Sequence, residues 1–298
     1  MTNTDSVISY AKQAVGYLGK SPTERMGLET GLYQLDQRIR GLHNGKLYVA
    51  AGRPGDGKTS FGTTVTANVM LQRDYPVLYV STELEEWEIM LQVAEAYTQG
   101  ISVYPNGRRS TQDEIDKLTA ALGALEAQEK YGLLNVIHQK RVSVEEMMAW
   151  IVTIKPEDDR PFLVIIDQAS RIQRDDANGR RQYTIATEEM LNEMEAMAHE
   201  SRSAVLLLTQ LNRQVDMQQT PLLSNIKHSG AYEEFAHCVL LLERMEGCGQ
   251  KKEGSGFVHY DSKIHVAKNR HGGLGPIDCN FYGVSHHWVE KPERTGMA

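Results

Sequence analysis

The stretch that decides the fold reads Gly52-Arg53-Pro54-Gly55-Asp56-Gly57-Lys58-Thr59. It matches the pattern GxxxxGK[ST], in which glycines let successive backbone N–H groups turn toward the phosphates of a nucleotide. The β-rich run KLYVAA at 46–51 precedes it, and a helical stretch over 58–73 follows. This order predicts a phosphate-binding loop, because the N-terminus of the helix adds positive potential at the same place.

The loop also predicts which residues bind a nucleoside triphosphate and Mg²⁺. We expect Lys58 to reach the β- and γ-phosphates and the Thr59 hydroxyl to ligate the ion. Asp167 is expected to be the second metal ligand, since it ends the apolar run at 162–166, and the carboxyl ends of parallel strands face the nucleotide. The expected nucleotide-binding set is Gly52, Arg53, Pro54, Gly55, Asp56, Gly57, Lys58, Thr59 and Ser60.

Glu83 is a candidate for the group that activates water during hydrolysis. It follows the β-rich run PVLYVS at 76–81, and adjacent parallel strands bring their carboxyl ends to one edge of the sheet. A second interpretation is equally good from the residues alone. Glu83 is followed by Glu85, Glu86 and Glu88, and acids near the start of a helix complement its dipole.

Outward from the loop, short β-rich runs alternate with long helical stretches. The runs are 46–51, 76–81, 162–167 and 204–209, and the helical stretches are 58–73, 86–99 and 183–200. This alternation predicts an α/β fold with a mostly parallel central sheet flanked by helices. After Leu211 the runs VLLLER, KIHVAK and PIDCNFYG have no long helix between them, which predicts hairpins at one edge of the sheet.

The 298 residues fit either two domains or one large α/β domain. Apolar residues spaced by three and four over 3–19 predict one amphipathic helix, so residues 1–25 are expected to form a linker or docking helix. Residues 26–290 are expected to form the main domain, and 291–298 a tail. The glycine-rich, charged segment 244–262 predicts a hairpin tip.

Composition narrows the classes of protein. A hydrophobic fraction of 41% and a charged fraction of 24% are typical of globular chains and argue against disorder. No apolar run is long enough to cross a bilayer and no signal peptide is recognisable, so we expect no membrane partner and a cytoplasmic location. Three unpaired cysteines predict neither a disulfide framework nor a metal site. With a net charge of −7, any DNA binding must come from local basic loops.

From about Gly31 to Glu290 the chain resembles the RecA-type motor domain of DnaB-family replicative helicases. The resemblance is carried by TGLYQLDQRIRGLHNGKLYVAAGRPGDGKT, VSTELEEWEIM, LVIIDQASRI, TQLNR, PLLSNIKHSGAYEEFAHCVLLLER and VAKNRHGGLG. It implies a RecA-like P-loop NTPase core that hydrolyses ATP or another NTP with Mg²⁺. The family commonly has Tyr or His after the aspartate of its metal-binding strand, and this chain has Gln168.

The resemblance also implies roles for single residues. In the catalytic set, Glu83 is the general base, Gln210 the γ-phosphate sensor, and Lys268 and Arg270 enter the neighbouring subunit's site, Arg270 as its arginine finger. A strand-end glutamine can bind phosphate without adding charge, so hydrolysis can move the loop that follows it. The implied DNA-binding residues are Lys227, His228, Ser229 and Gly230, with Arg180 and Arg181 as further candidates.

The function implied by the resemblance is an NTP-driven ring helicase that moves along single-stranded DNA and unwinds the duplex at replication forks. Six identical subunits are expected, with a primase or a helicase loader as candidate partners, and a motor of this size is typical of phage or mobile-element proteins. A RadA/RecA-type recombinase and a non-helicase regulatory or loader ATPase use the same core. The set of Lys58, Glu83 and Arg270 favours an active motor over a passive adaptor.

Overall fold

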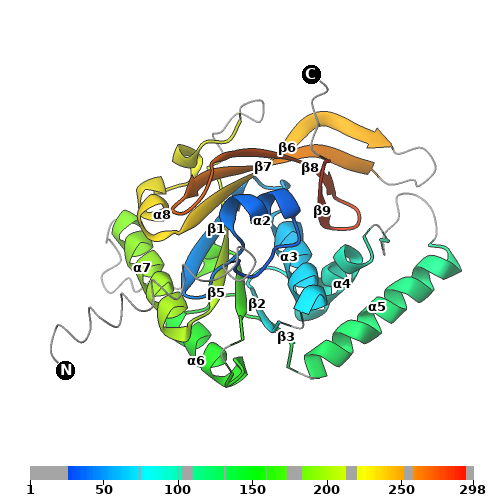
Figure 1. Cartoon of the computed structure of the whole chain (residues 1–298), viewed down its shortest axis with the longest axis horizontal. Coiled ribbons are helices and arrows are strands. Elements are labelled where there is room, and N and C mark those ends of the chain that lie inside the picture. The colour runs from blue at the N-terminus through cyan, green and yellow to red at the C-terminus, as the bar shows by residue number, and fades with distance from the viewer. Residues whose placement is uncertain are drawn as a thin grey trace.

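The computed structural model describes residues 26–292 except 74, 100, 103–109, 131, 159, 173–182, 213–219 and 252–257. Within them, nine strands form one sheet in the order β3-β2-β4-β5-β1-β6-β7-β8-β9 (Figure 1). The strands are β1 Lys46–Gly52, β2 Val77–Ser81, β3 Leu134–His138, β4 Leu163–Asp167, β5 Ala204–Gln210, β6 Cys238–Lys251, β7 Val258–Asn269, β8 Gly275–Tyr282 and β9 His287–Glu290.

Helices cover both faces of the sheet, with α3, α4 and α5 on one face and α6 and α7 on the other (Figure 1). The α-helices are α2 Tyr33–Ile39, α3 Lys58–Arg73, α4 Glu86–Tyr97, α5 Gln112–Lys130, α6 Val144–Ile154, α7 Tyr183–Ser201 and α8 Ser229–Phe235. Two 3₁₀ turns, η2 Ala169–Arg171 and η3 Leu223–Asn225, follow the carboxyl ends of central strands.

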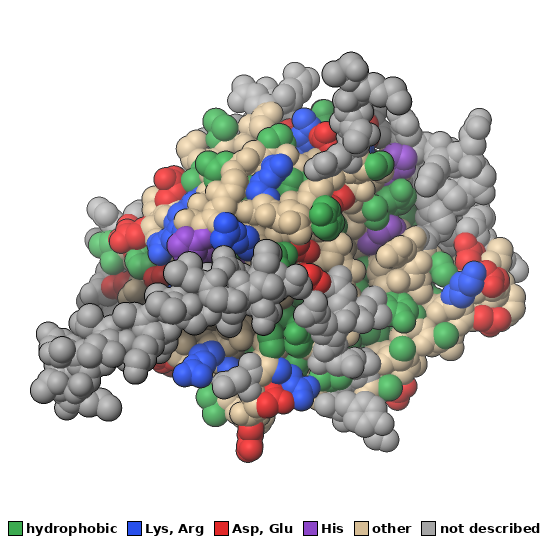
Figure 2. Space-filling model, in the orientation of Figure 1, with side chains coloured by type: hydrophobic (Ala, Val, Ile, Leu, Met, Phe, Trp, Pro, Cys, Tyr) green, Lys and Arg blue, Asp and Glu red, His purple; other side chains and the backbone are tan. Residues whose placement is uncertain are grey.

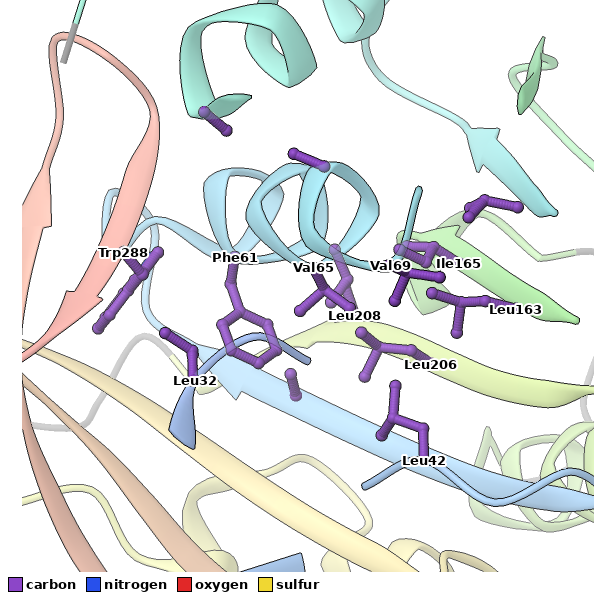
Figure 3. Packing of buried hydrophobic residues seen from close by; sticks show 14 of the residues in the cluster. Leu32, Leu42, Phe61, Val65, Val69, Leu163, Ile165, Leu206, Leu208 and Trp288 are labelled. Atoms are coloured by element: carbon purple, nitrogen blue, oxygen red, sulfur yellow. The ribbon is translucent and has the colours of Figure 1, made fainter. Parts of the chain in front are cut away.

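The central strands are buried on both sides, which explains their continuous apolar sequences. Successive residues of β4 point to opposite faces: Leu163 and Ile165 pack in the core under α3, whereas Val164 and Ile166 pack in the core under α6 and α7. Figure 3 shows the first of these cores, where Phe61 and Val65 of α3 lie over the side chains of β5.

Strand pairing confirms the predicted architecture. β1 pairs in parallel with β5 and with β6, and β2 pairs in parallel with β3 and with β4. The pairs β6–β7, β7–β8 and β8–β9 are antiparallel, as expected for hairpins at the edge. No helix among the described residues has both the length and the apolar character to cross a bilayer.

Several local predictions need correction. The helix predicted over 86–99 ends at Tyr97, because Gln99 takes a positive φ of 49° that an α-helix does not allow. The tip predicted over 244–262 is too long, since β6 runs to Lys251 and β7 starts at Val258, with pairing resumed after a register shift between Arg244 and Gly249. The segments 1–25 and 293–298 lie outside the described residues, so the predicted domain boundaries stay predictions.

Candidate nucleotide and motor site

A cavity of about 760 Å³ lies at the carboxyl ends of the central strands. Five of the predicted catalytic and metal-binding residues line it: Lys58, Thr59, Glu83, Asp167 and Gln210. They come from the start of α3 and from the ends of β2, β4 and β5, so they are far apart in sequence and close only because parallel strands end at one edge. The structure therefore brings the predicted catalytic and metal-binding residues of one subunit together.

The loop before α3 has the backbone shape that its glycines predict. Gly55 and Gly57 have φ angles of +83° and +76°, and a Cβ at Gly57 would lie 2.7 Å from the Phe281 ring. Arg53 and Asp56 are buried and do not line the cavity; Arg53 N donates to Asp56 Oδ2 at 2.9 Å and closes the turn. Pro54, Gly55, Gly57 and Ser60 line the cavity, whereas Gly52 does not.

Lys58 lies at the floor of this cavity and reaches back over the loop. Its Nζ donates to the Arg53 carbonyl at 3.1 Å. Burial lowers the pKa of Lys58, and the carboxylates of Asp167, Asp56 and Glu83 oppose that shift. The surrounding carboxylates favour the charged form of the ammonium, which suits the binding of phosphate in a concave site.

Thr59 and Asp167 meet at the same point. Thr59 Oγ1 donates to Asp167 Oδ2 at 2.6 Å, and Tyr79 Oη donates to the same oxygen at 3.2 Å. Burial raises the pKa of Asp167, while these two hydrogen bonds act against the rise. No group of three or more His, Cys, Asp or Glu residues in the described part of the chain could hold a metal by itself. A hydroxyl and one carboxylate fit Mg²⁺, which takes few protein ligands and completes its shell with phosphates and water.

Glu83 also lines the cavity, and its side chain is 45% exposed. Its Oε1 accepts a hydrogen bond from Gln168 Nε2 at 2.5 Å, and Arg171 Nη2 lies 4.0 Å from the same oxygen. Both partners follow Asp167 in the chain. Sequence patterns assign Gln168 no role, because the contact depends on the placement of β2 beside β4, whose register pairs Ser81 with Asp167.

Aromatic residues at the far end of the cavity were missed by the sequence analysis. Tyr260 of β7 and Phe281 of β8 stack with their ring centroids 6.1 Å apart, and the Arg244 guanidinium lies 4.7 Å from the centre of the Tyr260 ring. All three line the cavity. The signal that would have found them is the β7–β8 register, which places Tyr260 opposite Phe281 and needs the hairpin pairing to be known.

Lys268 and Arg270 do not line this cavity. Lys268 Nζ donates to the carbonyls of Glu233 and Ala236, and Arg270 Nη2 donates to the carbonyl of Glu234. These carbonyls belong to the last turn of α8 and to Ala236, the residue that caps it, where backbone acceptors have no partner within the helix. Their predicted place in a neighbouring subunit's site stays a prediction.

The predicted DNA-binding segment lies beside the end of β5. An isolated antiparallel bridge joins Leu211 to Ile226, and Asn212 N donates to the Asn225 carbonyl at 2.8 Å. Lys227 follows with an exposed side chain, and His228 takes a positive φ of 62° immediately before α8. Ser229 and Gly230 lie in the first turn of α8. Arg180 and Arg181 lie outside the described residues.

Basic side chains form no broad surface on the face shown in Figure 2. Among the described residues visible there, Lys and Arg are interspersed with Asp and Glu. On this face, the described residues therefore offer no broad basic surface to a nucleic acid.

Comparison with known proteins gives consistent matches. The family model of the DnaB-like helicase C-terminal domain matches residues 27–290. The chain is 28% identical over 276 residues to the replicative DNA helicase DnaC of Bacillus subtilis and 26% identical over 281 residues to DnaB of Geobacillus stearothermophilus. These matches cover 90% and 92% of this chain but 57% and 59% of the relatives, so the chain spans less than two thirds of their length.

Solved structures show the same fold. One of them, an isolated ATPase domain, superposes with a TM-score of 0.78 at 21% identity, covering 98% of this chain and 99% of that one. A DnaB-like replicative helicase, described together with its interactions with primase, superposes with a TM-score of 0.75 at 21% identity, covering 98% of this chain and 67% of that one. The predicted RecA-like architecture is therefore confirmed.

Proposed function

Because the chain belongs to the family of DnaB-like helicase C-terminal domains, we propose that it is the motor of a ring helicase that hydrolyses ATP, moves along single-stranded DNA and separates the duplex at replication forks. One observation carries the proposal. Gln210 lines the same cavity as Lys58, Asp167 and Glu83, and the residue after Gln210 is bridged to Ile226, next to the predicted DNA segment. A passive nucleotide-binding module needs neither the base nor that connection.

The proposed chemistry assigns one task to each side chain. The backbone of residues 52–60 and the Lys58 ammonium bind the phosphates of the nucleotide. Glu83 takes a proton from the attacking water, and its partly exposed side chain lines the same cavity as Lys58. Thr59 and Asp167 would hold Mg²⁺, which, when bound, neutralises charge on the phosphate oxygens.

The connection to DNA runs through the end of β5. Gln210 hydrogen-bonds the γ-phosphate in this proposal, and its neighbour Leu211 pairs with Ile226, one residue before Lys227. A change in the partner of Gln210 on hydrolysis would therefore shift the segment that contacts DNA, because the two segments share backbone hydrogen bonds.

Assembly and partners are proposed from the family. The predicted finger Arg270 makes no contact with the cavity of its own subunit, so a head-to-tail ring is needed to complete the site. Six subunits and contact with a primase or a helicase loader are proposed on the same basis. The DnaB-like helicase whose structure superposes on this chain is itself described together with its interactions with primase.

Lys227→Ala is expected to weaken binding of single-stranded DNA for all sequences. Its exposed ammonium would contact a phosphate, and each such contact on a single strand contributes about 0.7 to the slope of log affinity against log salt. Titration of labelled oligonucleotides at several salt concentrations measures both quantities. The control is Lys117→Ala, which removes an exposed lysine paired with Asp113 on α5. Unchanged affinity and slope for Lys227→Ala would reject residues 225–230 as the DNA segment.

The class of protein is tested by measuring particle mass with and without nucleotide and DNA, followed by strand separation on forks with a single tail of either polarity. A closed oligomer that unwinds forks at the expense of ATP is the expected result. A monomer whose ATPase ignores DNA would end the helicase proposal in favour of a regulatory ATPase. A long filament that pairs homologous strands would identify a recombinase instead.

A further inference from the structure

Gln168 occupies a fixed position between the metal-binding strand and the proposed base. It directly follows Asp167 and is 6% exposed. Its backbone N donates to Thr82 Oγ1 at 3.0 Å, and Thr82 N donates in turn to the Asp167 carbonyl at 2.6 Å. The backbone of Gln168 is thus tied to the residue that precedes Glu83, and Gln168 lines the cavity.

The amide of Gln168 is the hydrogen-bond donor that holds the Glu83 carboxylate. Among the described residues, the one hydrogen bond that this carboxylate accepts comes from Gln168 Nε2, at 2.5 Å from Oε1. The side chain of Glu83 is 45% exposed, so without this donor it would populate several rotamers. The amide fixes the orientation of the carboxylate through Oε1, and Oε2 accepts no hydrogen bond from the described residues.

A neutral donor suits this task better than a cation. Hydrogen bonds from charged donors are stronger and favour the ionised carboxylate more, so a cation in direct contact would make Glu83 a poorer base. Arg171 stays at 4.0 Å from Oε1, beyond hydrogen-bonding distance, and its side chain is 55% exposed. The neutral Gln168 therefore orients the Glu83 carboxylate, whereas the Arg171 guanidinium makes no direct hydrogen bond to it.

We propose that Gln168 is a positioning residue that holds Glu83 in the rotamer from which it accepts the proton of the attacking water. The proposal rests on the proposed function, since it requires Glu83 to be the base. It gives a role to the position at which this chain departs from the Tyr or His common in its family.

Gln168→Met removes the donor and keeps the length of the side chain. DNA-stimulated ATP turnover is expected to fall roughly tenfold in kcat with an unchanged KM for ATP, because a misplaced base slows the chemical step and leaves nucleotide binding intact. Gln112→Met is the matched control, since Gln112 lies on α5 far from the cavity and contacts the exposed Asp116. A wild-type kcat for Gln168→Met would overturn the proposal.

The pH profile separates positioning from a merely structural role. Gln168→Glu places a second carboxylate beside Glu83, which disfavours the ionised base and raises its pKa. Activity requires the ionised base, so the acidic limb of the kcat profile should move to higher pH, whereas Gln168→Met should lower the plateau with a much smaller movement of that limb. Circular dichroism confirms that each variant folds, and a profile for Gln168→Glu that coincides with wild type would contradict the proposal.

A double-mutant cycle shows whether Gln168 acts through Glu83. Adding Gln168→Met to Glu83→Gln should cause little further loss, because the base is already absent. Two independent losses that multiply would overturn the positioning role. A different result would show that Glu83 is not the base at all. In that case Glu83→Gln alone would keep wild-type turnover, with or without the substitution at Gln168.

Discussion

Arg270→Ala subunits are expected to hydrolyse ATP roughly a thousandfold more slowly than the unmodified protein, although their own P-loops are intact. A finger arginine stabilises charge on the γ-phosphate in the transition state, and its loss costs about three to five powers of ten in rate. Steady-state turnover in the presence of single-stranded DNA measures the effect. Arg270→Lys should recover little of it, because an ammonium lacks the planar, forked donor geometry of guanidinium.

Mixing experiments locate the arginine in the neighbouring subunit's site. Arg270→Ala subunits carry a good P-loop, and Lys58→Ala subunits carry a good finger. Where the P-loop of an Arg270→Ala subunit meets the finger of a Lys58→Ala subunit, that interface of the mixed ring has a complete site. Activity should therefore partly return. The control replaces the second partner with the Lys58→Ala, Arg270→Ala double variant, which supplies no finger. Equal activity in the two mixtures would show that Arg270 does not act between subunits.

Glu83→Gln is expected to lower turnover by roughly two to four powers of ten while nucleotide still binds. The amide keeps the shape of the side chain and cannot take a proton from water, so binding and chemistry separate. Lys58→Ala and Asp167→Ala should also nearly abolish hydrolysis. Equilibrium binding of a fluorescent ATP analogue, measured beside turnover, distinguishes variants that lose nucleotide binding from variants that lose only the chemical step. If Glu83→Gln turned over ATP at the wild-type rate, the base would have to be sought elsewhere, with Glu85 tested first.

Local patterns predicted the part of the site that depends on short-range geometry. The spacing of glycines before Lys58 specifies the loop, and a carboxylate at the end of an apolar strand specifies Asp167, because both signals lie within a few residues of one strand end. The parallel sheet followed from the alternation of runs in the same way. β3 and β9 were not predicted: β9 has only four residues, and β3, although as long as β2 and β4, is only half-buried along most of its length.

Side-chain contacts between distant segments could not be predicted from these patterns. Gln168 meets Glu83 only because β2 and β4 are neighbours in a particular register. Tyr260 and Phe281 meet only when β7 and β8 pair. Such contacts depend on register, and a shift by a single residue would turn each side chain to the opposite face of the sheet.

The hydrogen bonds of Lys268 and Arg270 to the last turn of α8 bear on how strongly subunits associate. To enter a neighbour's site, Lys268 must first give up two hydrogen bonds to backbone carbonyls of its own chain, and Arg270 must give up one. Ring closure is then an exchange of partners, and its affinity reflects the difference between the bonds lost and those gained. The same exchange would release one end of a seven-residue helix whose other end adjoins the predicted DNA segment.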